Sequence, residues 1–154
     1  MARRLASMVL GGLFGVALAS GAAAANPHFI GKPTVTDLGT RLKVTGTIAG
    51  LGNKDIKVTV VAKGIASITC TNPGGHVVPG KSTTTQIIAT GSSVEVKNGR
   101  ANFTVITGEP KAPAGSCPNP QWKATVKDVK FTFVTITVRQ PPGGAQVLHK
   151  QFHL

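Results

Sequence analysis

Two cysteines, each at the head of a Cys-x-Asn-Pro motif, are the residues of this chain best equipped for chemistry. Cys70 begins Cys-Thr-Asn-Pro and Cys117 begins Cys-Pro-Asn-Pro. Paired thiols form disulfides, bind metals or act as redox centres. In an exported protein the default for two cysteines is one disulfide, and free thiols are the less common alternative. Closing a loop of this length would stabilise the fold by roughly 4 kcal/mol on the chain-entropy model.

The Asn-Pro steps predict tight turns beside both cysteines. An asparagine side chain can accept a hydrogen bond from the backbone just ahead of it, and the proline pre-sets its own φ. A Cys70–Cys117 bridge would therefore hold loops 72–83 and 108–121 together at one end of the molecule. Most such bridges are structural staples, although a braced pair of loops also makes a binding platform. The candidate loop-binding residues are Asn72, Pro73, Lys111, Asn119 and Pro120.

The carboxylates are too scattered along the chain to indicate a catalytic site. A glycoside hydrolase needs two carboxylates about 5–10 Å apart, and nothing in the sequence brings two together. The Gly-x-Ser-x-Gly and His-Glu-x-x-His motifs are both absent. We therefore expect no catalytic residue and no enzyme. The acids, each in a different segment, are Asp37, Asp55, Glu95, Glu109 and Asp128.

The histidines and the tryptophan give no reason to expect a metal or a cofactor. His149 and His153 lie four residues apart on a predicted strand, which separates them by ~13 Å, too far for one ion. His28 follows Pro27, which lacks the amide proton that an amino-terminal copper site uses. Trp122 opens an alternating strand, so we expect it in the core rather than in a sugar-binding platform. The sequence predicts no metal and no cofactor.

Basic residues dominate the charge of the chain. It has 17 Lys and Arg against 5 Asp and Glu, a formal net charge of +12 at pH 7. On the predicted strands the basic residues mostly alternate with apolar ones, so we expect an outward-facing, candidate anion-binding surface. Solubility and the protection of sheet edges by lysine are the alternative explanation. Because no aromatic residues are interleaved with these lysines, any binding to nucleic acid would ignore base sequence. The candidate anion-binding residues are Arg41, Lys43, Lys57, Lys123, Lys127 and Lys130.

The first 25 residues predict export. Two arginines precede the apolar run 5–19 and a small-residue string that ends at Ala25, the order typical of a cleaved secretory signal peptide. A membrane anchor is the alternative, but the run is shorter than the ~20 residues that a spanning helix needs. We expect a signal peptide over 1–25 and one secreted domain over 26–154, with no membrane span once the leader is removed.

Strands must position all of these residues, because the chain after the leader shows period-two alternation and no helical periodicity. Leu42, Val44 and Ile48, for example, alternate with polar residues. Threonine, valine and isoleucine dominate, and Gly, Pro and Asn punctuate the segments at short intervals. Seven to nine antiparallel strands with one disulfide predict an immunoglobulin-like β-sandwich, with a small closed barrel as the alternative.

Several turn signals separate the predicted strands. Lys-Gly at 63–64 and Asn-Gly at 98–99 predict two-residue hairpins. Gly-Ser-Ser at 91–93 and Pro-Pro-Gly-Gly at 141–144 predict further turns. Over 122–139 the alternation slips twice, which indicates either one bulged strand or two strands joined by a tight corner.

The motifs around both cysteines resemble those of a known group of proteins. The runs are Cys-Thr-Asn-Pro-Gly-Gly at 70–75 and Gly-Ser-Cys-Pro-Asn-Pro-Gln-Trp at 115–122, followed by a Thr/Val-rich C-terminal third. In these runs the chain resembles small secreted all-β proteins of filamentous soil bacteria, and the resemblance spans nearly all of 34–154. It implies secretion, one disulfide and an all-β domain. It supplies no activity and no catalytic residue.

These patterns support three hypotheses of function. The leading one is a secreted, non-enzymatic protein that binds anionic cell-envelope polymers through a basic outer face. The second is a ligand-binding or protease-inhibitor-type protein that meets another extracellular protein through the braced loops, with Lys111 as the residue for a trypsin-like pocket. A secreted hydrolase is the third. Salt-reversible binding would favour the first hypothesis, and loss of function on reduction of the disulfide would favour the second.

Overall fold

Eight antiparallel strands make up the fold. The computed structural model describes residues 26–154, and the predicted signal peptide over 1–25 lies outside them. The strands are β1 (His28–Asp37), β2 (Leu42–Ala49), β3 (Ile56–Thr71), β4 (Val77–Pro79), β5 (Thr83–Val94), β6 (Ala101–Ile106), β7 (Lys123–Gln140) and β8 (Ala145–His153). None of residues 26–154 lies in a helix that is long and apolar enough to cross a membrane.

The strands form two sheets that pack face to face. Sheet A has the order β1-β2-β6. In sheet B the long strand β3 is central: β7 and then β8 lie on one side of it, and β5 and β4 share its other side. With the first, second and sixth strands in one sheet, this arrangement is an immunoglobulin-like antiparallel sandwich, which confirms the predicted fold class.

The alternation of side chains along each strand builds the core. On β3 every even-numbered residue from Ile56 to Cys70 is buried, and the residues between them are exposed or half-buried. Because successive side chains point to opposite faces, this pattern turns one face of β3 towards sheet A and the other outward. The largest of the fully buried side chains are Leu42, Ile48, Ile56, Ile136, Val44, Val58, Val60, Val129, Val134 and Val138.

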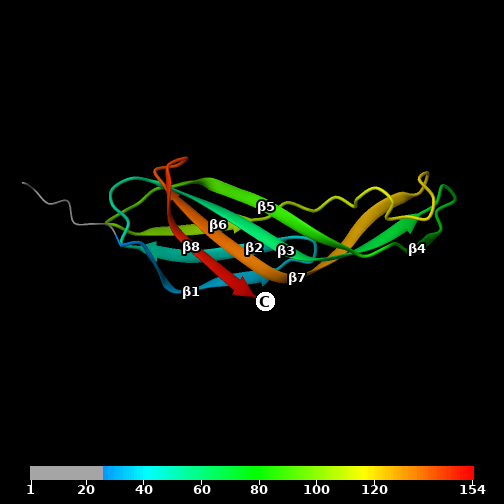
Figure 1. The fold of residues 1–154 in the computed structure, drawn as a ribbon, viewed down its shortest axis with the longest axis horizontal. Coiled ribbons are helices and arrows are strands. Elements are labelled where there is room, and N and C mark those ends of the chain that lie inside the picture. Colours follow the sequence, from blue (N-terminus) through cyan, green and yellow to red (C-terminus); the bar gives the residue numbers. More distant parts are fainter. Residues whose placement is uncertain (1–25) are drawn as a thin grey trace, which may run out of the picture.

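Strands β3 and β7 extend beyond the sandwich and form an arm. Figure 1 shows the elongated molecule, with sheet A beside one half of sheet B and the arm at the other end. We define the arm as residues 67–83 and 108–128, which include β4 and the two loops joined by the disulfide. In the arm the 108–121 loop takes the place of the second sheet, so Ile68 and Cys70 are buried although sheet A is absent there.

Two of the predicted turns are wrong. The chain does not turn at 63–64 or at 91–93, because β3 and β5 continue through these positions, although β5 is bulged at 91–92, where its register against β3 shifts. Position 64 requires glycine because of packing rather than a turn: a Cβ there would lie 2.5 Å from the carbonyl oxygen of Lys130 on β7. Gly91 likewise lets β5 approach Val105 of β6. Both glycines therefore permit close packing in extended backbone.

The other turn predictions are confirmed. Asn98 and Gly99 both have positive φ, 51° and 71°, between the bridged residues Lys97 and Arg100, as a two-residue hairpin requires. A turn also joins β7 to β8 at 141–144. Residues 123–140 form one bulged strand, because the register of β7 against β3 shifts twice, at Lys127 and at Thr132.

Candidate functional site

The outer face of sheet B carries an extended set of cations, which we call the basic face. It consists of Lys57, Lys63, Lys123, Lys130 and Arg139. Lys57 and Lys63 occupy odd-numbered positions of β3, so they point away from the core. The register places Arg139 opposite Lys57, Lys130 opposite Ile65, and Lys123 opposite Thr71, all on the same side of the sheet.

These cations lie in three groups along the length of the sheet. Lys57 with Arg139, Lys63 with Lys130, and Lys123 stand near successive points of β3 that are about seven residues apart. At a rise of about 3.3 Å per residue, the groups are roughly 20–25 Å apart and the basic face is roughly 45 Å long. Such a surface suits an extended ligand with repeated charges better than a small anion.

Threonine hydroxyls lie between the cation groups, together with the exposed side chains of Ile65 and Ile88. Thr59 and Thr137 are register partners, as are Thr69 and Thr125. The Thr59 hydroxyl lies 3.2 Å from that of Thr90 on β5. Hydroxyl groups both donate and accept hydrogen bonds, so this surface can meet the oxygens of a sugar, a polyol or a phosphate.

Few carboxylates neutralise the basic face. Asp128 is the register partner of the outward-facing Ser67, so it lies on this face between Lys123 and Lys130 and is its one carboxylate among residues 26–154. Among residues 26–154 the ion pairs join Glu95 to Lys97 at 3.3 Å and Glu109 to Arg41 at 3.9 Å, and neither pair uses a cation of the basic face. The field of the face therefore stays positive and is available to a ligand.

The structure divides the six predicted anion-binding residues among different surfaces. Lys57, Lys123 and Lys130 lie on the basic face. Lys127 sits in a bulge of β7 and has no register partner on β3. Lys43 faces outward from sheet A, on the opposite side of the sandwich. Arg41 lies in the turn before β2, in the ion pair with Glu109.

Sequence reasoning missed Lys63 and Arg139. The Lys-Gly pair predicts a turn at Lys63, but Lys63 continues the alternation that begins at Lys57, and that continuity is the signal that identifies it as an outward strand residue. Arg139 follows the apolar run of β7 and pairs with Lys57 only through the register of the folded sheet. Its guanidinium also donates a hydrogen bond to the carbonyl oxygen of Gly144 at 3.0 Å, which fixes its position at the end of the face.

The two predicted loops are joined as expected. Cys70 and Cys117 form a disulfide with a Cα–Cα distance of 5.7 Å, as predicted. The backbone N–H of Lys81 donates to the carbonyl oxygen of Ser116, which ties loop 72–83 to loop 108–121. At Gly80 a Cβ would lie 2.8 Å from the Cys70 sulfur, so only glycine lets the loops meet so closely.

Both asparagines of the Cys-x-Asn-Pro motifs act inside their own turns. The Asn72 side-chain oxygen accepts a hydrogen bond from the N–H of His76 at 2.8 Å, and that of Asn119 accepts one from Gln121 at 2.9 Å. Pro73 and Pro120 are exposed beside them. The asparagine oxygens therefore hold the turns, which leaves the surrounding surface, rather than these side chains, for a partner.

Lys111 lies apart from the motif asparagines, whereas Trp122 lies beside Asn119, because its backbone N–H donates to the carbonyl oxygen of Asn119 at 3.1 Å. Lys111 shares a shallow cavity with Glu109 and the first residues of β7. Trp122 is half-buried against the 108–121 loop and does not belong to the hydrophobic core, so the prediction of core burial is wrong.

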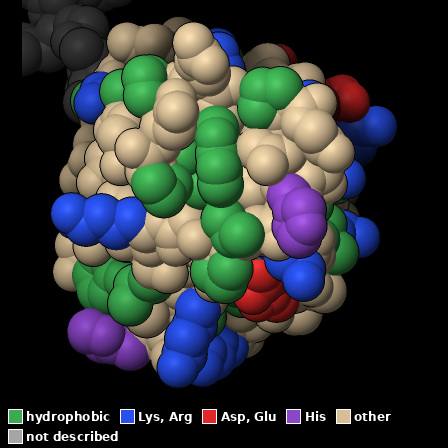
Figure 2. Space-filling view, turned by 90° about the vertical axis from the view of Figure 1, so that its right-hand side faces the viewer, with side chains coloured by type: hydrophobic (Ala, Val, Ile, Leu, Met, Phe, Trp, Pro, Cys, Tyr) green, Lys and Arg blue, Asp and Glu red, His purple; other side chains and the backbone are tan. Residues whose placement is uncertain are grey.

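Figure 2 views the arm end of the molecule, where hydrophobic side chains run down the middle of the face and Lys and Arg lie around them.

The acids and histidines of the described residues form no metal-binding group. No three His, Cys, Asp or Glu side chains between 26 and 154 come close enough together to hold an ion. His149 hydrogen-bonds Thr137 on the outer side of sheet B, and the His153 ring packs edge-on against Phe133 at 5.0 Å. His28 turns back onto the carbonyl oxygen of Asn26.

Comparison with known proteins adds no relative to this picture. The chain matches no protein-family model, and no curated protein matches it.

Proposed function

We propose that this chain is a secreted, non-enzymatic protein that binds an anionic cell-envelope polymer along the basic face. The observation that carries the proposal is the alignment of Lys57, Lys63, Lys123, Lys130 and Arg139 on one face of sheet B, outside the ion pairs of residues 26–154. The disulfide is consistent with an oxidising, extracellular location.

The shape and chemistry of the face favour a linear polymer. Three cation groups over roughly 45 Å match a chain that repeats a phosphate or a carboxylate, because each group can contact a successive part of it. The hydroxyls of Thr59 and Thr137 suit the polyol or sugar units between those charges.

Nucleic acid is the less suitable polyanion. Phe133 is the aromatic residue of the basic face, and its ring is half-buried against His153. Base stacking needs open aromatic surfaces, so a nucleic acid would bind here only through its phosphates. We expect such binding to be independent of base sequence and to weaken steeply with salt.

Two double variants of equal charge test the proposal. Lys63→Gln/Lys130→Gln removes the central cation group, whereas Lys43→Gln/Lys97→Gln removes two lysines from other surfaces. Binding of the disulfide-bonded protein to isolated cell walls and to an immobilised polyuronate is measured over a salt series. We expect the first variant to bind about tenfold more weakly at low salt. The slope of log affinity against log salt concentration should also become shallower by about two.

The control variant decides between a site and a net-charge effect. Lys43→Gln/Lys97→Gln should keep affinity within about twofold of the parent protein, because both lysines lie off the basic face. Equal weakening by the two variants, or no wall binding at low salt, would overturn the proposal.

A protein partner at the arm end is the second candidate function. The observation in its favour is the braced pair of loops, with Val77 59% exposed on β4 and a hydrophobic stripe across that end. This function would survive the loss of Lys63 and Lys130 and disappear in Cys70→Ala/Cys117→Ala. A trypsin-like protease partner would also require Lys111, so Lys111→Ala separates an inhibitor from a general binding loop.

A further inference from the structure

One side of the sandwich is closed and the other is open. On the closed side β5 packs against β6, and Gly91 allows the close approach. On the other side the edge strands β1 and β8 leave a groove of about 680 Å³ between them. The residues that line it are His28, Phe29, Gly31, Lys32, Pro33, Leu148, His149, Lys150 and Phe152.

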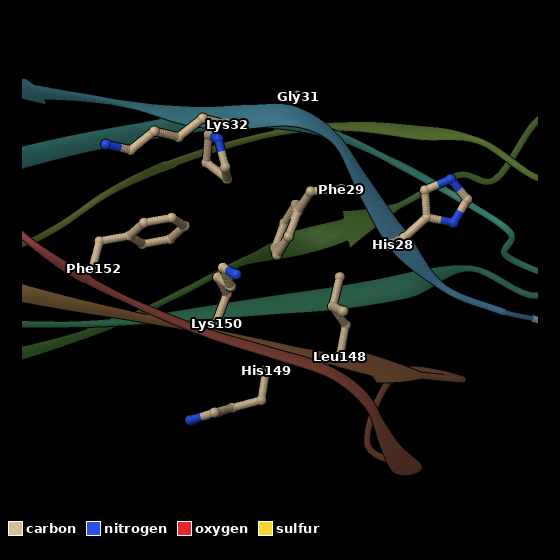
Figure 3. Close-up of a pocket in the computed structure, with 9 residues that line it drawn as sticks. His28, Phe29, Gly31, Lys32, Leu148, His149, Lys150 and Phe152 are labelled. Carbon is tan, nitrogen blue, oxygen red and sulfur yellow. The ribbon is translucent and has the colours of Figure 1, made fainter.

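The floor of this groove is apolar. Leu148 and Phe152 pair in register with Val138 and Val134 of β7, so they point to the inner side of sheet B. Phe29 pairs with Ile48 and points inward from sheet A. Figure 3 shows the Phe29 side chain projecting from β1, and those of Leu148 and Phe152 from β8, into the space between the two strands. All three are half-buried, so they offer apolar surface to whatever enters.

Two lysines lie at the groove, and one of them, Lys150, occupies a position where a closed sandwich would have a core residue. Lys150 lies between Leu148 and Phe152 in an inward register position opposite Ile136, a fully buried residue. The Lys32 ammonium lies 6.0 Å from the centre of the Phe152 ring. No Asp or Glu lines the groove, and neither lysine belongs to an ion pair of residues 26–154.

We propose that the groove binds a single-tailed anionic amphiphile, a long-chain carboxylate. The tail would lie on Phe29, Leu148 and Phe152, and the carboxylate would meet the ammonium groups of Lys32 and Lys150. The volume is within the range of small-molecule sites, which pair a largely apolar lining with a few charged groups. A lysine at the inward position of Lys150 makes less apolar contact than a core side chain would. A bound carboxylate, which forms a charge-assisted hydrogen bond with the ammonium group, explains why a lysine is there.

A polypeptide strand suits this groove less well. Pro33 has no N–H to donate, and the register of β1 breaks between Ile30 and Thr34, so the edge of sheet A cannot pair continuously. The polymer site lies on the opposite, outward side of sheet B, whereas the groove lies at the inner edge between β1 and β8. Lysines at sheet edges also hinder strand pairing, and the experiment separates that role from ligand binding.

Calorimetric titration with matched amphiphiles tests the head-group preference. Decanoate and decyltrimethylammonium, both below their micellar concentrations, have the same tail and opposite charges. We expect saturable one-to-one binding of decanoate and at least about tenfold weaker binding of the cation. Equal affinity for both, or no saturable binding of decanoate, would overturn the proposal.

Three single variants locate the site. Lys150→Met keeps the length of the side chain and removes its charge, and we expect roughly tenfold weaker decanoate binding. Leu148→Trp fills the groove and should reduce binding further, while Lys57→Met on the outer face of the same sheet should leave it unchanged. Thermal unfolding confirms that each variant is folded. Equal weakening by Lys57→Met would overturn the proposal.

The proposal for the groove and the proposal for the basic face can be tested independently of each other. Lys63→Gln/Lys130→Gln should bind decanoate as the parent protein does, whatever its affinity for cell walls. A competition experiment uses decanoate and a synthetic β-strand peptide. If the peptide binds and decanoate does not, the groove serves strand addition instead, and the proposal is overturned.

Discussion

Thr107 shows how one buried hydroxyl fixes the junction between β2 and the loop that leaves β6. It is 2% exposed, and its hydroxyl accepts a hydrogen bond from the N–H of Leu42 at 2.9 Å. The N–H of Thr107 in turn donates to the carbonyl oxygen of Leu42. No sequence pattern marks this threonine among the many others, because its role depends on a partner 65 residues away.

Thr107→Val should lower the free energy of unfolding by about 1–3 kcal/mol. The change keeps the shape of the side chain but leaves the buried N–H of Leu42 without its acceptor. Thr104→Val, at an exposed position of the preceding strand β6, is the control and should change stability by less than about 0.5 kcal/mol. Urea unfolding of both variants checks the prediction, and a smaller loss for Thr107→Val than for the control would contradict it.

Gly64→Ala should destabilise the protein by about 2 kcal/mol. Its new methyl group would press on the backbone of Lys130 and Phe131, neither of which can rotate away. Gly52→Ala is the matched control, because nothing lies within 4 Å of a Cβ there. Parallel denaturant titrations measure the difference. Equal stability of the two variants would contradict the close packing of β7 against β3 at Gly64.

At the scale of elements, the sequence predicted the strands better than their connections. Period-two alternation and its two slips in β7 are local properties, so the chain alone indicated the irregular positions, but only the register of the folded sheet shows one bulged strand rather than two strands and a corner. A Lys-Gly pair that packs against a neighbouring strand looks the same in sequence as one that turns, so the hairpin at 63–64 was predicted in error. The disulfide was predictable because two cysteines in an exported chain pair by default, whatever the packing around them.

Removal of the disulfide should loosen the arm and leave the sandwich folded. Cys70 and Cys117 are 47 residues apart, and the loss of this cross-link should lower the free energy of unfolding by about 4 kcal/mol on the chain-entropy model. In Cys70→Ala/Cys117→Ala we expect faster amide exchange over 108–121, with β2 and β6 least affected. Calorimetry gives the stability, and exchange spread evenly over both sheets would contradict a separate arm.

For the whole molecule, the sandwich class was predictable and the arrangement of its surfaces was not. Strand number and alternation indicate two packed sheets. Which lysines share a face depends on sheet register, and so Lys43 and Lys57 looked equivalent in sequence although they lie on opposite sides. The open groove between β1 and β8 depends on which strands become edges, a property that no local pattern contains.

Amide exchange should rank the strands by their place in sheet B. β3 is paired on both sides along nearly its whole length, with β7 on one side and β5 and β4 on the other. Its amides should therefore open only with global unfolding, whereas the outward amides of the edge strand β8 should exchange at least about a hundredfold faster. NMR exchange rates check the order. Fast exchange at the centre of β3 would contradict the topology.

The central place of β3 also shapes how the chain reaches its fold. The hydrogen bonds that join it to β7 span long stretches of sequence, 56 residues from Thr69 to Thr125 and 69 from Lys63 to Thr132. Such non-local pairing makes folding slow, and until β7 pairs with it β3 is a β-branched segment with an open edge, which favours aggregation. Lys57 and Lys63 interrupt that segment with charge, so the cations that we assign to polymer binding would also act as gatekeepers of a soluble nascent chain.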